Sequence, residues 1–431
     1  MRKILLGTTA VVGLAVAAPA AFAQSSLIGQ GPHGATGSPA VATSGLSVRL
    51  GGFFDFTYGM VTDSVDKGDF RGANAASRQS HDMRTESEIN LYVDGRASNG
   101  LQYGAVFELQ MDNMQTSTSG SGTGVDYDEL YGFVKGAWGE LRFGQEDSAA
   151  SLMQVMAPSV LWMGRSDSWD EFAVQNYGSN PTKVGYTMAG INDGNDSTKI
   201  IYLSPQFNGF DFGLSYSPNR YEGEHYQQSN TSSAYQRDYT GLTNEISYAL
   251  RYRGTLGGVG IQASFAGQMA DSARQSASGV RLATRDQNVN AYSVGLVLSG
   301  LVPGLQVGGD YTWGKYQGIP AGGSVARGVD GSDMIGVGAV YTTGALSVGA
   351  QYVIANQSNG GTVADRTSTY IGAGLAYVVA PGLTLFGNYN KITDENVPTA
   401  APTSAGATLT TFGGDKTRDV TVMVAGVRVA F

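Results

Sequence analysis

The chain has 431 residues, a formal net charge of −9 and no cysteine, and 15% of its residues are charged. An acidic chain lacks the basic surface that nucleic-acid binding requires, and a chain without cysteine has neither disulfide bonds nor thiolate metal sites. Beyond the first 23 residues no run of 18 apolar residues occurs, which excludes membrane-spanning helices. The mixture of 62 Gly and 23 Tyr with 12 Pro favours strands that face lipid on one side and water on the other.

Residues 1–23 have the layout of a secretory signal peptide. Arg2 and Lys3 precede an apolar run at 4–18, and small residues precede the expected cleavage between Ala23 and Gln24. The run is too short for a membrane anchor, which needs about 20 apolar residues. Removal of this segment takes away two basic residues, so the exported chain carries a charge of −11.

The sequence changes character after a lead that is rich in Gly, Ala, Ser and Pro. This lead, residues 24–45, has no periodicity, and we expect it to be flexible. From Leu46 onward apolar and polar residues alternate, as in Phe54, Asp55 and Phe56. Such alternation places the two kinds of residue on opposite faces of a strand. A soluble β-sandwich shows the same pattern, but aromatic residues near the strand ends favour a membrane barrel.

The alternation predicts an all-β fold, a transmembrane barrel of antiparallel strands that spans residues 46–431. Sixteen strands are expected, at 46–58, 83–94, 100–112, 126–136, 139–146, 197–204, 210–217, 241–254, 258–270, 288–299, 304–314, 333–343, 345–355, 368–380, 382–392 and 418–431. Very short connections alternate with long polar ones, as periplasmic turns and extracellular loops do in bacterial barrels. Residues 182–189 are an alternative extra strand. About sixteen strands leave an aqueous lumen.

Five segments in this order resemble the Gram-negative general porin family, and the likeness covers nearly all of the mature chain. They are residues 45–59, 83–112, 128–147, 197–218 and 422–431. The resemblance implies a homotrimeric channel in the outer membrane, in contact with lipid and lipopolysaccharide, that passes ions and small hydrophilic solutes by passive diffusion. It also implies that residues 112–125 latch onto a neighbouring subunit, although an ordinary extracellular loop is the alternative.

By resemblance, residues 147–180 form the third loop, which folds into the barrel and narrows the pore. Its acidic residues are Asp147, Asp167, Asp170 and Glu171, and its base is Arg165. Acids in a narrow constriction of low dielectric constant attract cations, so we expect weak cation selectivity. The alternative is that the acids belong to a solvated loop.

The resemblance implies a basic wall opposite this loop. Alternation places five arginines at inward positions of their strands, namely Arg49, Arg84, Arg142, Arg251 and Arg253. Facing the loop acids, they would set up a transverse field that orients dipolar solutes. The alternative is that each arginine pairs with a neighbouring carboxylate, as Arg84 could with Glu86 or Glu88.

The end of the sequence predicts a strand with one apolar face. Val427, Val429 and Phe431 lie on this face, with Arg428 on the other. The resemblance implies that the face and its terminal aromatic residue are the signal that the barrel-assembly machinery reads. The alternative is a closing strand that simply presents an apolar face to lipid.

Patterns for catalysis or cofactor binding are missing from the sequence. The three histidines have no metal-ligand spacing, and no nucleophile stands in a recognisable catalytic motif, so we expect neither an enzyme nor a cofactor or metal. Residues 192–196 lack the glycine and the distant glutamate of an EF-hand, and calcium binding by the loop acids is left open. The rival functions are a substrate-selective channel, suggested by Trp162 and Trp169, and a structural or adhesive barrel.

Overall fold

The computed structural model describes most of the predicted barrel. The described residues are 41–43, 45–64, 79–111, 126–162, 165, 172–173, 190–191, 196–219, 242–272, 274, 288–315, 331–358, 365–396 and 417–431. Several predictions lie outside them: the signal peptide with its cleavage site at Ala23 and Gln24, the extra strand at 182–189, and the loop acids Asp167, Asp170 and Glu171. No helix in the described part of the chain is both long and apolar enough to cross a membrane.

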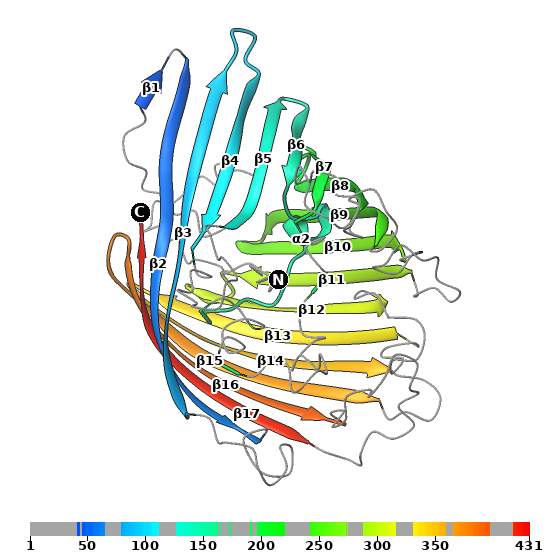
Figure 1. The fold of residues 1–431 in the computed structure, drawn as a ribbon. Coiled ribbons are helices and arrows are strands. Elements are labelled where there is room, and N and C mark those ends of the chain that lie inside the picture. Colours follow the sequence, from blue (N-terminus) through cyan, green and yellow to red (C-terminus); the bar gives the residue numbers. More distant parts are fainter. Residues whose placement is uncertain are drawn as a thin grey trace, which may run out of the picture.

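Sixteen antiparallel strands form a closed barrel, because β17 returns to pair with β2 (Figure 1). The strands are β2 (Leu46–Asp63), β3 (His81–Arg96), β4 (Gln102–Gln110), β5 (Asp126–Gly136), β6 (Gly139–Gln145), β7 (Thr198–Leu203), β8 (Phe210–Asn219), β9 (Thr243–Leu256), β10 (Val259–Asp271), β11 (Val289–Ser299), β12 (Leu305–Lys315), β13 (Gly331–Thr343), β14 (Leu346–Ser358), β15 (Arg366–Ala380), β16 (Leu383–Glu395) and β17 (Arg418–Ala430). The predicted fold class and strand number are confirmed, and most boundaries differ by a few residues.

The outer face of the barrel is apolar, and the inner face is polar on strands such as β2. On β2, Phe54 and Met60 are 42% and 52% exposed on the outside, whereas Asp55 and Thr57 are almost fully buried on the inside. This is the reverse of a soluble protein, in which large apolar side chains are covered. Lipid therefore provides the apolar surroundings that the outer face requires.

A short additional strand, β1 (Val41–Thr43), pairs antiparallel with β2, with Val41 opposite Val48. It lies within residues 24–45, whose expected flexibility stays a prediction. The pairing follows from the uneven ends of the strands, since β17 covers β2 only from Phe53 onward. β1 thus occupies the edge of β2 that β17 leaves open, and Gly45, at φ 91°, makes the turn between them.

Two buried ion pairs join the first and last strands of the barrel. Asp55 on β2 pairs with Arg428 on β17, with a shortest distance of 2.5 Å, and Asp63 pairs with Arg418 at 2.6 Å. Both arginines contact their carboxylates through two nitrogens, the arrangement that gives strong, directional charge-assisted bonds. We call this β2–β17 junction the seam.

Candidate functional site

The chain turns into the lumen after β6 and runs along the inner wall. We call residues 147–162 together with Arg165 the internal segment; it begins with the short helix α2 (Ala149–Met153), which lies inside the barrel (Figure 1). Buried backbone N–H groups need acceptors, and the wall supplies them. The amides of Ala149, Ala150 and Val155 donate to the hydroxyls of Ser215 on β8, Ser247 on β9 and Ser264 on β10, at 3.0, 3.0 and 2.7 Å. Three neighbouring strands thus hold the first half of the internal segment.

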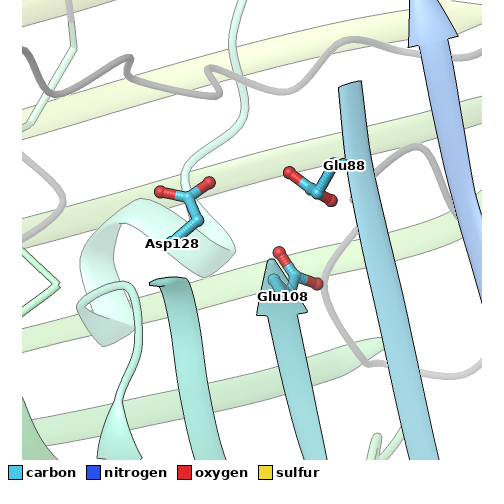
Figure 2. A group of neighbouring side chains, drawn as sticks. All are labelled: Glu88, Glu108 and Asp128. Carbon is cyan, nitrogen blue, oxygen red and sulfur yellow. The ribbon is translucent and has the colours of Figure 1, made fainter. Parts of the chain in front are cut away.

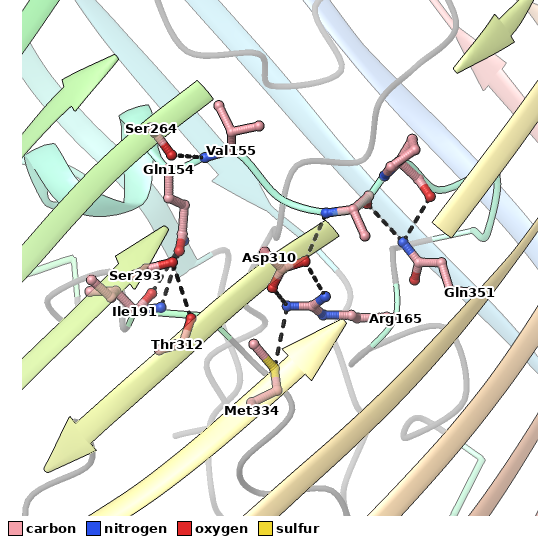
Figure 3. A network of polar contacts seen from close by, with 12 residues as sticks. Gln154, Val155, Arg165, Ile191, Ser264, Ser293, Asp310, Thr312, Met334 and Gln351 are labelled. Atoms are coloured by element: carbon pink, nitrogen blue, oxygen red, sulfur yellow. Dashed lines mark hydrogen bonds and ion pairs between the residues drawn. The ribbon is translucent and has the colours of Figure 1, made fainter. Parts of the chain in front are cut away.

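The second half of the internal segment is held from β12 and β14 (Figure 3). The amide of Ala157 donates to Asp310 Oδ1 at 2.8 Å, and Arg165 makes a two-pronged ion pair with the same carboxylate at 2.8 and 2.7 Å. On β14, Gln351 Nε2 donates to the carbonyl oxygens of Ala157 and Pro158 at 2.9 and 3.0 Å. Side chains of the wall thus bind both an N–H group and carbonyl groups of the backbone at Ala157 and Pro158.

Close to its end, the internal segment reaches the seam. Trp162 donates from Nε1 to Asp55 Oδ2 at 2.8 Å and stacks on Phe386 of β16, with ring centroids 5.6 Å apart. Leu161 and Trp162 belong to a buried apolar cluster with inward residues of β13–β17, which include Met334, Val353, Tyr370, Ile392, Val420, Val422 and Val424. The inner wall is apolar here because the internal segment covers it, so the segment lies packed against the wall rather than hanging free in the lumen.

Glycines on the wall make room for this close approach. A Cβ at Gly338 on β13 would lie 2.5 Å from Pro158 O, closer than van der Waals contact allows. A Cβ at Gly295 on β11 would collide with Val155 O. Glycine within a strand is a known sign that another backbone approaches closely. These inward glycines are the sequence signal from which the path of the internal segment could have been predicted.

The five predicted wall arginines lie on the inward side of their strands, and the ion pairs described here involve Arg49, Arg142, Arg251 and Arg253. The partners are Asp94 for Arg49, Glu140 and Glu146 for Arg142, and Asp211 for both Arg251 and Arg253, at 2.5 to 3.1 Å. The guanidinium of Arg84 lies 6.0 Å from the ring centroid of Phe172. Sequence reasoning did not identify Asp94 or Asp211 as partners, since that choice depends on strand register. The transverse field of the arginines stays a prediction.

Carboxylates gather on another part of the wall, across β3, β4 and β5 (Figure 2). Glu88, Glu108 and Asp128 each place a carboxylate oxygen within 4.8 Å of the other two, and we call them the wall acids. Glu88 and Glu108 are 2% and 4% exposed. Sequence reasoning expected the acids of the site on the loop, and it missed this group on the wall.

A β-bulge explains how β5 contributes to the wall acids. The register between β4 and β5 shifts between Phe107 and Leu109, so that Glu108 faces two consecutive residues, Asp128 and Glu129. A bulge breaks the strict alternation and redirects the side chains at that point. Period-two reasoning alone therefore could not place Asp128 on the inner face.

The remaining predicted residues lie at the start of the internal segment and at the end of β17. Asp147 is half-buried, and its Oδ2 accepts a hydrogen bond from the Ser151 hydroxyl at 3.1 Å. Val429 and Phe431 are exposed on the outer face, at 42% and 43%. The backbone of Phe431 exchanges two hydrogen bonds with that of Gly52, at 3.0 and 3.1 Å, and so extends the seam.

Comparison with known proteins agrees with this architecture. A family model described as Gram-negative porin matches residues 7–397. The chain belongs to the Gram-negative porin family. The porin is therefore an outer-membrane β-barrel that crosses the membrane with many strands, and its family and fold are those of non-enzymatic channels.

Solved structures similar to the porin share its fold at low sequence identity. An anion-selective porin from Comamonas acidovorans matches with a TM-score of 0.54 and 16% identity, over 90% of this chain and 100% of that one. A loop L8 deletion mutant of OmpT, an outer membrane protein of Vibrio cholerae, matches with a TM-score of 0.51 and 11% identity, over 90% and 100% of the two chains. No curated protein sequence matches the porin.

Proposed function

We propose that this porin passes ions and small hydrophilic solutes by passive diffusion, with a preference for cations. The observation that carries the preference is the wall acids, three carboxylates within 4.8 Å of one another on the inner face of β3–β5. Although Glu88 and Glu108 are themselves buried, the field of grouped carboxylates reaches through surroundings of low dielectric constant into the adjoining passage, where it raises the local concentration of cations. Asp147 at the start of the internal segment adds to this field, as would Asp167, Asp170 and Glu171, which lie outside the described residues.

The basic residues of the wall do not oppose this preference strongly. Arg49, Arg142, Arg251 and Arg253 form their ion pairs with carboxylates outside the wall acids. Their charges balance as a set, because the two arginines that share Asp211 are offset by the two carboxylates that pair with Arg142. A neutral ion pair has only a short-ranged dipolar field, whereas like charges grouped together add. We therefore do not expect this chain to share the anion selectivity that the name of the Comamonas acidovorans porin states for that protein.

The test is the reversal potential across a potassium chloride gradient in a planar bilayer. Wild-type porin should prefer potassium. Neutralising the wall acids together (Glu88→Gln, Glu108→Gln, Asp128→Asn) should move the cation-to-anion permeability ratio toward one. Glu245→Gln on β9 is the control, because Glu245 is also a buried carboxylate, at 8% exposure, but does not belong to the wall acids.

An anion-preferring wild type, or equal effects of both changes, would contradict the proposed cation selectivity. Absence of current from folded porin would reject diffusion.

A substrate-selective channel is the alternative class of function. Of its two suggested aromatic residues, Trp162 is 5% exposed and engaged with Asp55 and Phe386, which favours a bracing role. A selective channel should saturate with its solute, whereas diffusion of neutral sugars into proteoliposomes should rise linearly with concentration and fall smoothly with solute size.

We also propose that the porin works as a homotrimer in lipid and lipopolysaccharide, and that the barrel-assembly machinery recognises Val427, Val429 and Phe431. The outward position of Val429 and Phe431 supports the second part, because a recognised face must be accessible before the strand meets lipid. Mass measurement of the porin released in native detergent would test the trimer. Phe431→Ala should lower the assembled fraction in outer membranes more than Phe207→Ala, a change at a more exposed aromatic outside the proposed signal.

A further inference from the structure

One carboxylate binds both ends of the turn from Ala157 to Arg165 in the internal segment. Asp310 accepts hydrogen bonds from the amide of Ala157, where the turn begins, and from the guanidinium of Arg165, where it ends (Figure 3). Asp310 and Arg165 are each 4% exposed, so this junction lies beneath the segment and away from the water-filled passage. We infer that Asp310 is the positioning residue that fixes the internal segment and thereby sets the width of the channel. The inference rests on the proposed diffusion function.

The chemistry of the junction explains why Asp310 matters more than the serine contacts from β8, β9 and β10. The hydroxyls of Ser215, Ser247 and Ser264 each accept one neutral hydrogen bond from the segment. Asp310 instead provides the charge that allows the guanidinium of Arg165 to be buried, through two parallel bonds. Without that charge, the guanidinium is driven toward water, because an uncompensated buried cation is costly.

The remaining contacts between the internal segment and the wall determine how the segment responds when the ion pair between Asp310 and Arg165 is lost. Gln351 still binds the carbonyl groups of Ala157 and Pro158, and Trp162 still reaches Asp55. We therefore expect the turn to become more mobile while the barrel stays closed. A mobile turn changes the effective width of the passage, which a merely stabilising ion pair elsewhere on the wall would not do.

The experiment compares Asp310→Asn with wild type in a background that carries Val160→Cys. The chain has no cysteine of its own, so this thiol is the only reactive one, and Val160 is 8% exposed within the turn. In folded barrels in detergent, the Asp310→Asn change should raise the rate of maleimide labelling at least about tenfold, within the range that loss of one partner of a buried ion pair provides. In proteoliposomes it should also raise the size limit for neutral oligosaccharides.

Asp394→Asn is the matched control. Asp394 is fully buried on β16 and pairs with Arg366 through two bonds, but none of the hydrogen bonds described for it involves the internal segment. This variant should lose a comparable ion pair and leave the labelling rate and the size limit at wild-type values. Equal labelling in both variants, or no change in the Asp310→Asn variant, would overturn the inference.

A second variant, Arg165→Lys, tests the same inference if Asp310→Asn yields no folded barrel. Arg165→Lys keeps the positive charge but replaces the planar fork with a single ammonium group, which weakens the junction less. It should give a labelling rate between wild type and that of a freely accessible thiol; a wild-type rate would contradict the inference. Labelling does not depend on current, so a folded porin that conducts nothing would reject the diffusion function and still show whether Asp310 holds the turn.

Discussion

Asp55 connects three distant parts of the chain through one side chain. Its Oδ1 accepts from Arg428 Nε at 2.8 Å, and its Oδ2 accepts from both Arg428 Nη2 and Trp162 Nε1, at 2.5 and 2.8 Å. Asp55 is fully buried, so water does not substitute for these partners. A residue of this kind contributes to stability and to the position of the internal segment at once.

The surroundings of a carboxylate should decide the effect of neutralising it. Asp55→Asn should lower the free energy of unfolding by about 3–5 kcal/mol, since it removes one partner of a buried ion pair. Asp94→Asn should lower it by at most about 1 kcal/mol, because Asp94 and Arg49 are half-exposed. Urea unfolding in lipid vesicles, followed by tryptophan fluorescence, measures both. Equal losses would contradict the argument.

At the scale of elements, the internal segment and the wall beneath it fit by shape. Gly338→Ala should displace Pro158 and destabilise the porin by about 1–3 kcal/mol, the usual cost of overpacking, and it should alter single-channel conductance. Gly387→Ala is the control, because a Cβ there meets nothing closer than 3.8 Å. The conductance of this control should equal that of wild type. An equal change in both variants would contradict the view that Gly338 makes room specifically for the internal segment.

The strands could be predicted from the sequence and the path of the internal segment could not. Alternation is local, so a strand such as β12 is visible in its own residues. Asp310, however, is one more polar residue in that alternation, and its partner Arg165 lies 145 positions away. In the same way, Arg251 was placed on the inner face, but Asp211 became its partner only through the register of β8 against β9. The alternation of polar and apolar residues therefore does not determine which side chains of different elements contact each other.

At the scale of the whole molecule, the barrel depends on correct closure at the seam. Asp63→Arg and Arg418→Asp should each strongly reduce the fraction that migrates as folded barrel in unheated gels, because each places like charges together in a buried site. The double variant restores opposite charges and should recover much of the folded fraction. A double variant no better than either single variant would show that the pair does not specify closure.

The cation preference proposed above belongs to the field of the whole lumen and should depend on salt. The screening length falls from about 10 Å at 0.1 M to about 3 Å at 1 M ionic strength. The cation-to-anion permeability ratio should therefore decline toward one as the mean salt concentration rises. Reversal potentials at a constant concentration ratio measure this decline. A ratio that does not vary with salt would point to tight binding or to size rather than to the field.

The seam also bears on how the chain acquires its structure. Asp63 and Arg418 are separated by 355 positions, and Asp55 and Arg428 by 373. Contacts between such distant residues form slowly, because a long loop must close before they are made. They also require that both the early strand β2 and the late strand β17 have been synthesised. A chain interrupted before Arg418 lacks the partners of both carboxylates, so closure at the seam distinguishes chains that contain β17 from truncated ones.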